Sequence, residues 1–133
     1  MTDTLTFVRS LYAAFGRGDV PGILATLDPA IVWISNGDPA TIPWAGTRTG
    51  PEGALSFFQA LGGALDFEVF EPGRFLESGD TVTVLGRTRA RHKAGGHGVF
   101  ECEWAHIFTI RNGKLARFQE FYDTAAIERA LAA

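Results

Sequence analysis

Residues 99–110 place mostly apolar side chains at every second position, and this pattern restricts the fold more than any other in the chain. One face of the segment would carry Phe100, Cys102, Trp104, His106, Phe108 and Ile110. The other face would carry Glu101, Glu103 and Thr109. A two-residue period of this kind predicts a β-strand with its apolar face on a core and its polar face in solvent.

Three further extended segments surround this strand in the sequence, at residues 67–76, 80–92 and 115–122. The segment before it places three arginines on one face, Arg87, Arg89 and Arg91, where they can pair across strands with Glu101 and Glu103. Its other face carries Val82, Val84, Gly86, Thr88 and Ala90. The two strands therefore agree on which face is inside, and together the segments predict an antiparallel meander.

Helices are predicted before the meander. The first spans about residues 3–15, with Asp3 or Thr4 as its cap, and the second is a short helix capped by Asp19 that carries Ile23, Leu24 and Leu27. A strand at residues 31–35 and a long loop from Asn36 to Gly50 follow, and the loop is long enough to form a lid or a pocket mouth.

A third helix begins near Pro51, turns Leu55, Phe58 and Leu61 inward and closes at Gly62-Gly63. After the meander, Asp123 can cap a short C-terminal helix.

This order predicts one α+β domain over residues 1–133, in which a cone-like curved antiparallel sheet wraps around three N-terminal helices and encloses a pocket. The charge balance is 12 Lys and Arg against 15 Asp and Glu, which argues against nucleic-acid binding. No apolar run or signal core points to a membrane. The single cysteine, Cys102, excludes an internal disulfide and fits a cytoplasmic location.

Several short motifs occur along this series of elements. They are Gly18-Asp19, Trp33, Pro43-Trp44-Ala45-Gly46 followed by Gly50, Trp104-Ala105-His106, and Asn112-Gly113-Lys114 leading to Glu120-Phe121-Tyr122-Asp123. With these motifs, essentially the whole chain resembles the nuclear transport factor 2-like superfamily, and within it the SnoaL-like branch related to ketosteroid isomerase. The resemblance implies the cone-shaped fold, a homodimer, and either a cofactor-free enzyme or a non-catalytic binding domain.

The resemblance does not extend to the catalytic set of ketosteroid isomerase. Ile34 stands where that family has its basic aspartate, and Asp38 in the following loop is the nearest carboxylate. His106 stands at the position of the second aspartate, and Tyr12 lies one residue out of register with the family tyrosine. The inward positions of the last strand fall on Phe118, Glu120 and Tyr122.

The turn at residues 111–114 decides whether Glu120 faces inward. A two-residue Asn112-Gly113 loop would place His106 on the same face as Arg117, and a three-residue loop would place it on the same face as Glu120. The residues suit both turns, and the resemblance favours the three-residue loop. Glu120 would then be a near-diagonal neighbour of His106.

We therefore expect a cofactor-free acid–base site without a metal. His106 would be the general acid/base, Glu120 would orient it or act as a second acid/base, and Tyr12 or Tyr122 would donate a hydrogen bond to a substrate oxygen. The expected walls for a small hydrophobic or aromatic ligand are Trp33, Trp44, Phe58, Trp104 and Phe118, with Asp38 at the mouth.

Each of these residues also has a structural interpretation. His106 can be a hydrogen-bonded core histidine, Glu120 can point into solvent if the facing is reversed, and Asp38 can be a turn residue. Three functions remain open from the sequence: an isomerase, cyclase or dehydratase, a small-molecule binding module, and a protein that dimerises through the outer face of its sheet.

Overall fold

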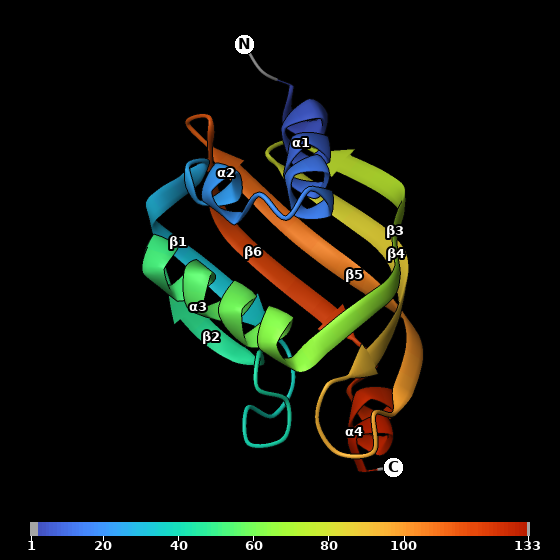
Figure 1. Cartoon of the computed structure of the whole chain (residues 1–133). Helices are drawn as coiled ribbons and strands as arrows, with labels where there is room; N and C mark the ends of the chain where they lie inside the picture. The colour runs from blue at the N-terminus through green and yellow to red at the C-terminus, as the bar shows by residue number, and fades with distance from the viewer. Residues whose placement is uncertain (1–2, 133) are drawn as a thin grey trace.

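The computed structural model describes residues 3–132 as four helices and one six-stranded sheet (Figure 1). The helices are α1 (Thr4–Gly16), α2 (Val20–Leu24), α3 (Gly50–Ala64) and α4 (Thr124–Ala132). The strands are β1 (Leu27–Ser35), β2 (Gly46–Thr49), β3 (Leu65–Ser78), β4 (Thr81–His92), β5 (Val99–Arg111) and β6 (Lys114–Tyr122). No helix in this described part of the chain is long and apolar enough to cross a membrane.

The sheet has the order β2-β1-β6-β5-β4-β3 and curves around the N-terminal helices, so the α+β expectation is confirmed (Figure 1). Four of its five ladders are antiparallel, and β1 runs parallel to β6. The sheet is therefore mixed, whereas the sequence predicted an antiparallel sheet. The inward faces of β4 and β5 are those that the two-residue period predicts.

Three acidic side chains begin helices where the sequence predicts caps. Asp3 accepts a hydrogen bond from the Leu5 amide, Asp19 from the Gly22 amide and Asp123 from the Ala126 amide. Each carboxylate satisfies an amide that the first helical turn leaves free.

Two strand boundaries differ from the prediction. The first strand begins at Leu27, which pairs with Leu115 of β6 and does not belong to the second helix. The predicted loop contains the edge strand β2, in which Arg48 pairs with Trp33. The Arg48 guanidinium donates to the Trp44 and Ala45 carbonyls. The pairing with β1 and these local hydrogen bonds define a four-residue strand that has no amphipathic pattern of its own.

The buried face of α3 also differs from the prediction. Ala54 and Phe57 are buried, whereas Leu55 is 36% exposed, so the prediction for Leu55 was wrong. The Gly62-Gly63 pair lies inside the helix, which continues to Ala64 and runs directly into β3.

The arginines of β4 form ion pairs on the outer face of the sheet. Arg87 contacts Glu101 at 3.4 Å, as predicted, and also Glu71 of β3 at 3.1 Å, while Arg89 lies 2.8 Å from Glu68. Glu103 faces Arg87 in the ladder, but the described ion pairs use the other carboxylates. These side chains are well exposed, so each pair adds little to stability.

The β5–β6 hairpin turns Glu120 to the predicted face, but its turn and its pairing register differ from the prediction. Its turn is the two-residue Asn112-Gly113 loop, with a positive φ at both residues and Arg111 paired with Lys114. The register then shifts: Ile110 pairs with Leu115, but Thr109 pairs with Arg117. This one-residue bulge at Ala116 turns Glu120 inward, directly opposite His106. The three-residue loop and the diagonal placement were wrong, and the inward facing of Glu120 is confirmed.

Gly86→Ala should destabilise the protein. A Cβ atom at position 86 would lie 2.6 Å from the Glu71 carbonyl oxygen and would collide with the Trp104 ring. We expect a loss of about 1–3 kcal/mol in the free energy of unfolding, measured by denaturant titration. Gly63→Ala is the matched control, since its Cβ meets nothing within 4 Å in a helix, and it should be neutral or stabilising by up to about 1 kcal/mol. Equal stability of the two variants would refute this account of Gly86.

Candidate functional site

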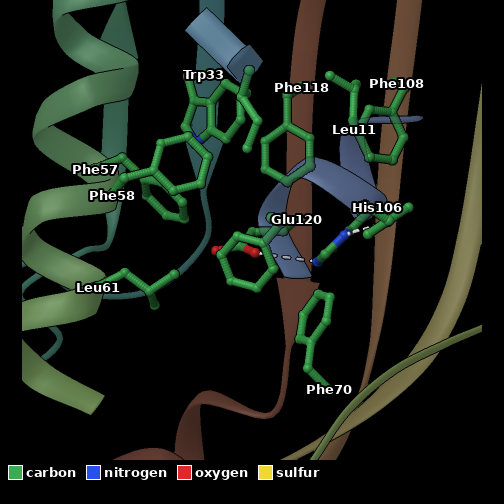
Figure 2. A pocket seen from close by; sticks show the side chains of 13 residues that line it. Leu11, Trp33, Phe57, Phe58, Leu61, Phe70, His106, Phe108, Phe118 and Glu120 are labelled. Carbon is green, nitrogen blue, oxygen red and sulfur yellow. Dashed lines mark hydrogen bonds and ion pairs between the residues drawn. The ribbon is translucent and has the colours of Figure 1, made fainter. Parts of the chain in front are cut away.

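A cavity of about 70 Å³ lies between the N-terminal helices and the concave face of the sheet (Figure 2). Ten of its thirteen lining residues are apolar: Leu11, Phe15, Ile23, Trp33, Phe57, Phe58, Leu61, Phe70, Phe108 and Phe118. The other three, Tyr12, His106 and Glu120, come from α1, β5 and β6. The cavity is thus an aromatic enclosure with its polar groups gathered at one side.

His106 and Glu120 form the centre of this polar group. They are opposite each other in the β5–β6 ladder, and His106 Nε2 lies 3.3 Å from Glu120 Oε2 (Figure 2). Both residues are buried, with 6% and 9% of their surface exposed. A buried charge needs a partner, and here each of the two ionisable groups provides one for the other.

Tyr12 occupies the other nitrogen of the imidazole. Its hydroxyl lies 2.7 Å from His106 Nδ1. An ionised carboxylate carries no proton, so a neutral ring keeps its proton on Nε2, which faces Glu120 across the 3.3 Å ion-pair contact. Nδ1 then accepts from the Tyr12 hydroxyl. Both ring nitrogens are engaged, and the imidazole connects the phenol to the carboxylate.

Ser35 holds the second oxygen of the carboxylate. Its hydroxyl donates to Glu120 Oε1 over 2.6 Å and lies 2.8 Å from the Tyr122 hydroxyl. The residue is 1% exposed and was not among the predicted site residues. Trp33 was predicted to face inward, and the two-residue period of the strand would have placed Ser35 on the same face. Ser35, and not Ile34, is the inward side chain at the end of β1.

Trp104 covers one face of the imidazole. The two rings are nearly parallel, at 15°, with centroids 3.8 Å apart. The Trp104 indole N–H donates to the Thr88 hydroxyl over 2.8 Å, and Gly86 leaves the space that the indole ring fills. Stacking and the hydrogen bond together fix the plane of the His106 ring, so that its nitrogens point at Tyr12 and Glu120.

The predicted site residues divide between two neighbouring cavities. Trp33, Phe58 and Phe118 line the first with Tyr12, His106 and Glu120. Trp44, Trp104 and Tyr122 line a second cavity of about 60 Å³, which His106 and Glu120 also border.

Asp38 lines neither cavity. It is exposed and accepts a hydrogen bond from the Ala40 amide, so it is a turn residue and its predicted place at the mouth was wrong. Seven further residues line the first cavity without a site role predicted from the sequence: Leu11, Phe15, Ile23, Phe57, Leu61, Phe70 and Phe108.

The remaining histidines and the cysteine have other surroundings. His92 is buried and its Nε2 donates to the Ile127 carbonyl, which ties β4 to α4. His97 lies in the exposed turn between β4 and β5. Burial raises the pKa of the Cys102 thiol. Among residues 3–132 there is no group of three His, Cys, Asp or Glu side chains placed to hold a metal ion.

Comparison with known proteins gives a family and a fold. The model of the SnoaL-like domain family matches residues 8–118. A nuclear transport factor 2-like protein from Burkholderia xenovorans is 32% identical over 96% of this chain and 95% of that one, with a TM-score of 0.86. One from Burkholderia pseudomallei is 28% identical over 100% of both chains, with a TM-score of 0.89.

More distant structures share the fold alone. A candidate isomerase from Rhodopseudomonas palustris is 20% identical over 100% of this chain and 99% of that one, with a TM-score of 0.79. Candidate polyketide cyclases from Pseudomonas putida and Xanthomonas campestris have the same fold. No curated protein matches this sequence.

Both tyrosines should remain un-ionised until the protein unfolds in alkali. Burial, and then the charge of Glu120, raises the pKa of Tyr12, and burial is also the main cause of the raised pKa of Tyr122. The unfolded value is about 10, so this stabilisation is complete below about pH 10 and is lost as the pH rises further. The loss should be at most about 1.4 kcal/mol per pH unit for each tyrosine.

The measurement is ultraviolet absorption of tyrosinate, followed together with circular dichroism. The chain has only these two tyrosines, so the signal reports on both. Tyr12→Phe should reduce the slope of stability against pH above about pH 10 by roughly half. Tyrosinate absorption that appears near pH 10 while the protein is still folded would contradict the burial argument.

Proposed function

The chain belongs to the SnoaL-like family, and from that premise we propose that it is a cofactor-free enzyme that transfers protons on a small hydrophobic or aromatic carbonyl compound. The reaction would be of the isomerase, cyclase or dehydratase type. One observation carries the proposal: Tyr12, His106 and Glu120 line the apolar cavity in one continuous row, with a hydrogen bond between the first two and an ion-pair contact between the last two. Charges and dipoles act strongly there because the surroundings are apolar.

The order of the three groups supports a division of roles. Both imidazole nitrogens are engaged, so His106 exchanges a proton with Tyr12, holds its charge beside Glu120 and does not itself take a proton from the substrate. Tyr12 is the group that reaches a substrate oxygen, and Glu120 lines the same cavity as the base. This assignment refines the expectation that His106 is the direct acid or base.

Enolisation would proceed from the state in which His106 is protonated and Glu120 is ionised. Glu120 takes a proton from the carbon beside the carbonyl, and the C–H electron pair becomes the enol double bond. The carbonyl oxygen takes the Tyr12 proton, and Tyr12 recovers one from His106 Nδ1. The charges of His106 and Glu120 are both cancelled in this step. Return of the Glu120 proton to a different carbon, with the Tyr12–His106 transfers reversed, gives an isomer and restores the site.

A non-catalytic binding domain is the second candidate, and a specific observation favours it. His106 Nδ1, His106 Nε2 and Glu120 Oε1 each have a hydrogen-bond or ion-pair partner within the protein. A site so fully satisfied is stable without a substrate, and it suits a ligand that is held and released unchanged.

Hydrogen exchange in heavy water tests the proposed function. Aryl ketones with an enolisable C–H bond, beginning with acetophenone and benzyl phenyl ketone, are incubated with the protein, and loss of the proton NMR signal of that bond is followed. We expect catalysed exchange, reduced about 100-fold or more in His106→Gln and in Tyr12→Phe. His97→Asn is the control, because His97 is exposed and asparagine tolerates its positive φ.

Exchange that is unchanged in His106→Gln would refute the proposed mechanism. A ketone that binds in the cavity and is recovered without exchange would establish the binding-domain alternative instead.

A further inference from the structure

We propose that the natural ligand is a two-lobed molecule, with an apolar ring-bearing group on each side of a central oxygen function. Each lobe would occupy one of the two neighbouring cavities, and the oxygen would lie between them, within reach of the Tyr12 hydroxyl. This inference rests on the proposed function for the identity of the central group, and it adds the shape of the substrate.

The two cavities meet at the polar pair. Four residues border both of them: Leu61, Phe70, His106 and Glu120. A group that lies against His106 and Glu120 therefore has an apolar chamber on each side. The first chamber has about 70 Å³ and the second about 60 Å³, both far below the roughly 300–1,000 Å³ of pockets that enclose a drug-sized ligand. The two chambers together are also smaller than that range, so a two-lobed ligand has to be small and has to displace side chains between them.

Apart from His106 and Glu120, the residues that border both chambers are Leu61 and Phe70. Leu61 and Phe70 are half-buried and have no polar side-chain atom, and Phe70 is held by ring contacts alone, with its centroid 5.1 Å from that of Trp104. Phe70 also follows a register shift in the β3–β4 ladder, between Phe67 and Val69. A change of rotamer at these two positions would join the chambers without breaking a hydrogen bond of the network.

Phe70 also borders a third hollow, next to both chambers. An open groove of about 530 Å³ between α1 and β3 is lined by Tyr12, Phe15, Phe67 and Phe70, among others. Phe70 borders this groove and both chambers. The same movement that joins the chambers would open them to the groove, which gives a two-lobed ligand a way in.

The walls indicate that both lobes carry rings. The aromatic residues that line the first chamber and not the second are Tyr12, Phe15, Trp33, Phe57, Phe58, Phe108 and Phe118. Phe67, Trp44, Phe100, Trp104 and Tyr122 are those of the second alone. Flat aromatic faces on both sides favour planar lobes, which stack or meet them edge to face.

The three tryptophans of the chain allow a direct test, because each indole N–H gives one NMR signal. Trp33 lines only the first chamber, and Trp44 and Trp104 line only the second. Benzyl phenyl ketone, with two rings, should shift the Trp33 and Trp44 signals together. Acetophenone, with one ring, should shift only one of them and bind about tenfold more weakly or worse.

A variant that fills the second chamber separates the two probes. Cys102 lies on the inner face of β5 and lines that chamber. Cys102→Leu should weaken benzyl phenyl ketone about tenfold and leave acetophenone in the first chamber nearly unaffected. Cys102→Ser, which keeps the volume, is the matched control. The measurement on the unaltered protein stands even if the leucine variant fails to fold.

The outcomes distinguish this inference from the proposed function. If benzyl phenyl ketone shifts only one of the two reporter signals, or binds no more tightly than acetophenone, the two-lobed ligand is refuted, and hydrogen exchange still decides the function. If both signals shift and no exchange occurs, the two-lobed ligand stands and the enzyme proposal fails. If neither ketone shifts any indole signal, the inference is refuted.

Discussion

The pairing of β5 with β6 determines what the interior of this protein contains, because a shift of one residue would turn every β6 side chain to the opposite face. Leu115, Phe118 and Glu120 are all buried, although the first two are three positions apart. Only an extra residue in the strand makes this spacing compatible with one inner face, and the bulge at Ala116 supplies it. The bulge thus brings a carboxylate into an otherwise apolar enclosure, opposite His106.

A buried carboxylate and imidazole need partners, and neighbouring elements provide them. Tyr12 comes from α1 and Ser35 from β1, while Trp104 stacks on the imidazole from the same strand. Ser35 donates a hydrogen bond to Glu120, and His106 links Tyr12 to the same carboxylate through a hydrogen bond and an ion-pair contact, so the network converges on Glu120. Because the rest of the first cavity is apolar, this network is the part of the site that can act on a ligand chemically.

Sequence patterns predicted the elements that have a clear period or a clear cap. The facing of β4 and β5 and the caps at Asp3, Asp19 and Asp123 follow from local chemistry, and they match the structure. The edge strand β2 could not be predicted because its pairing with β1 defines it, and the bulge at Ala116 could not be predicted because the turn residues suit more than one register. The division of the interior into two cavities also could not be predicted, because side chains from several different elements line each cavity. The two-residue period of β1 would have predicted that Ser35 faces inward with Trp33, but Ser35 was not among the predicted site residues.

The account depends most directly on the hydrogen bonds of the His106 ring, which nitrogen NMR of the imidazole measures. At a pH where the ring is neutral, the account predicts a proton on Nε2 and an unprotonated Nδ1 that accepts from Tyr12. The Nε2 proton should exchange slowly with water because the pair is buried. A neutral ring protonated on Nδ1, or a rapidly exchanging mixture of both tautomers, would contradict the proposed connection of Tyr12, His106 and Glu120.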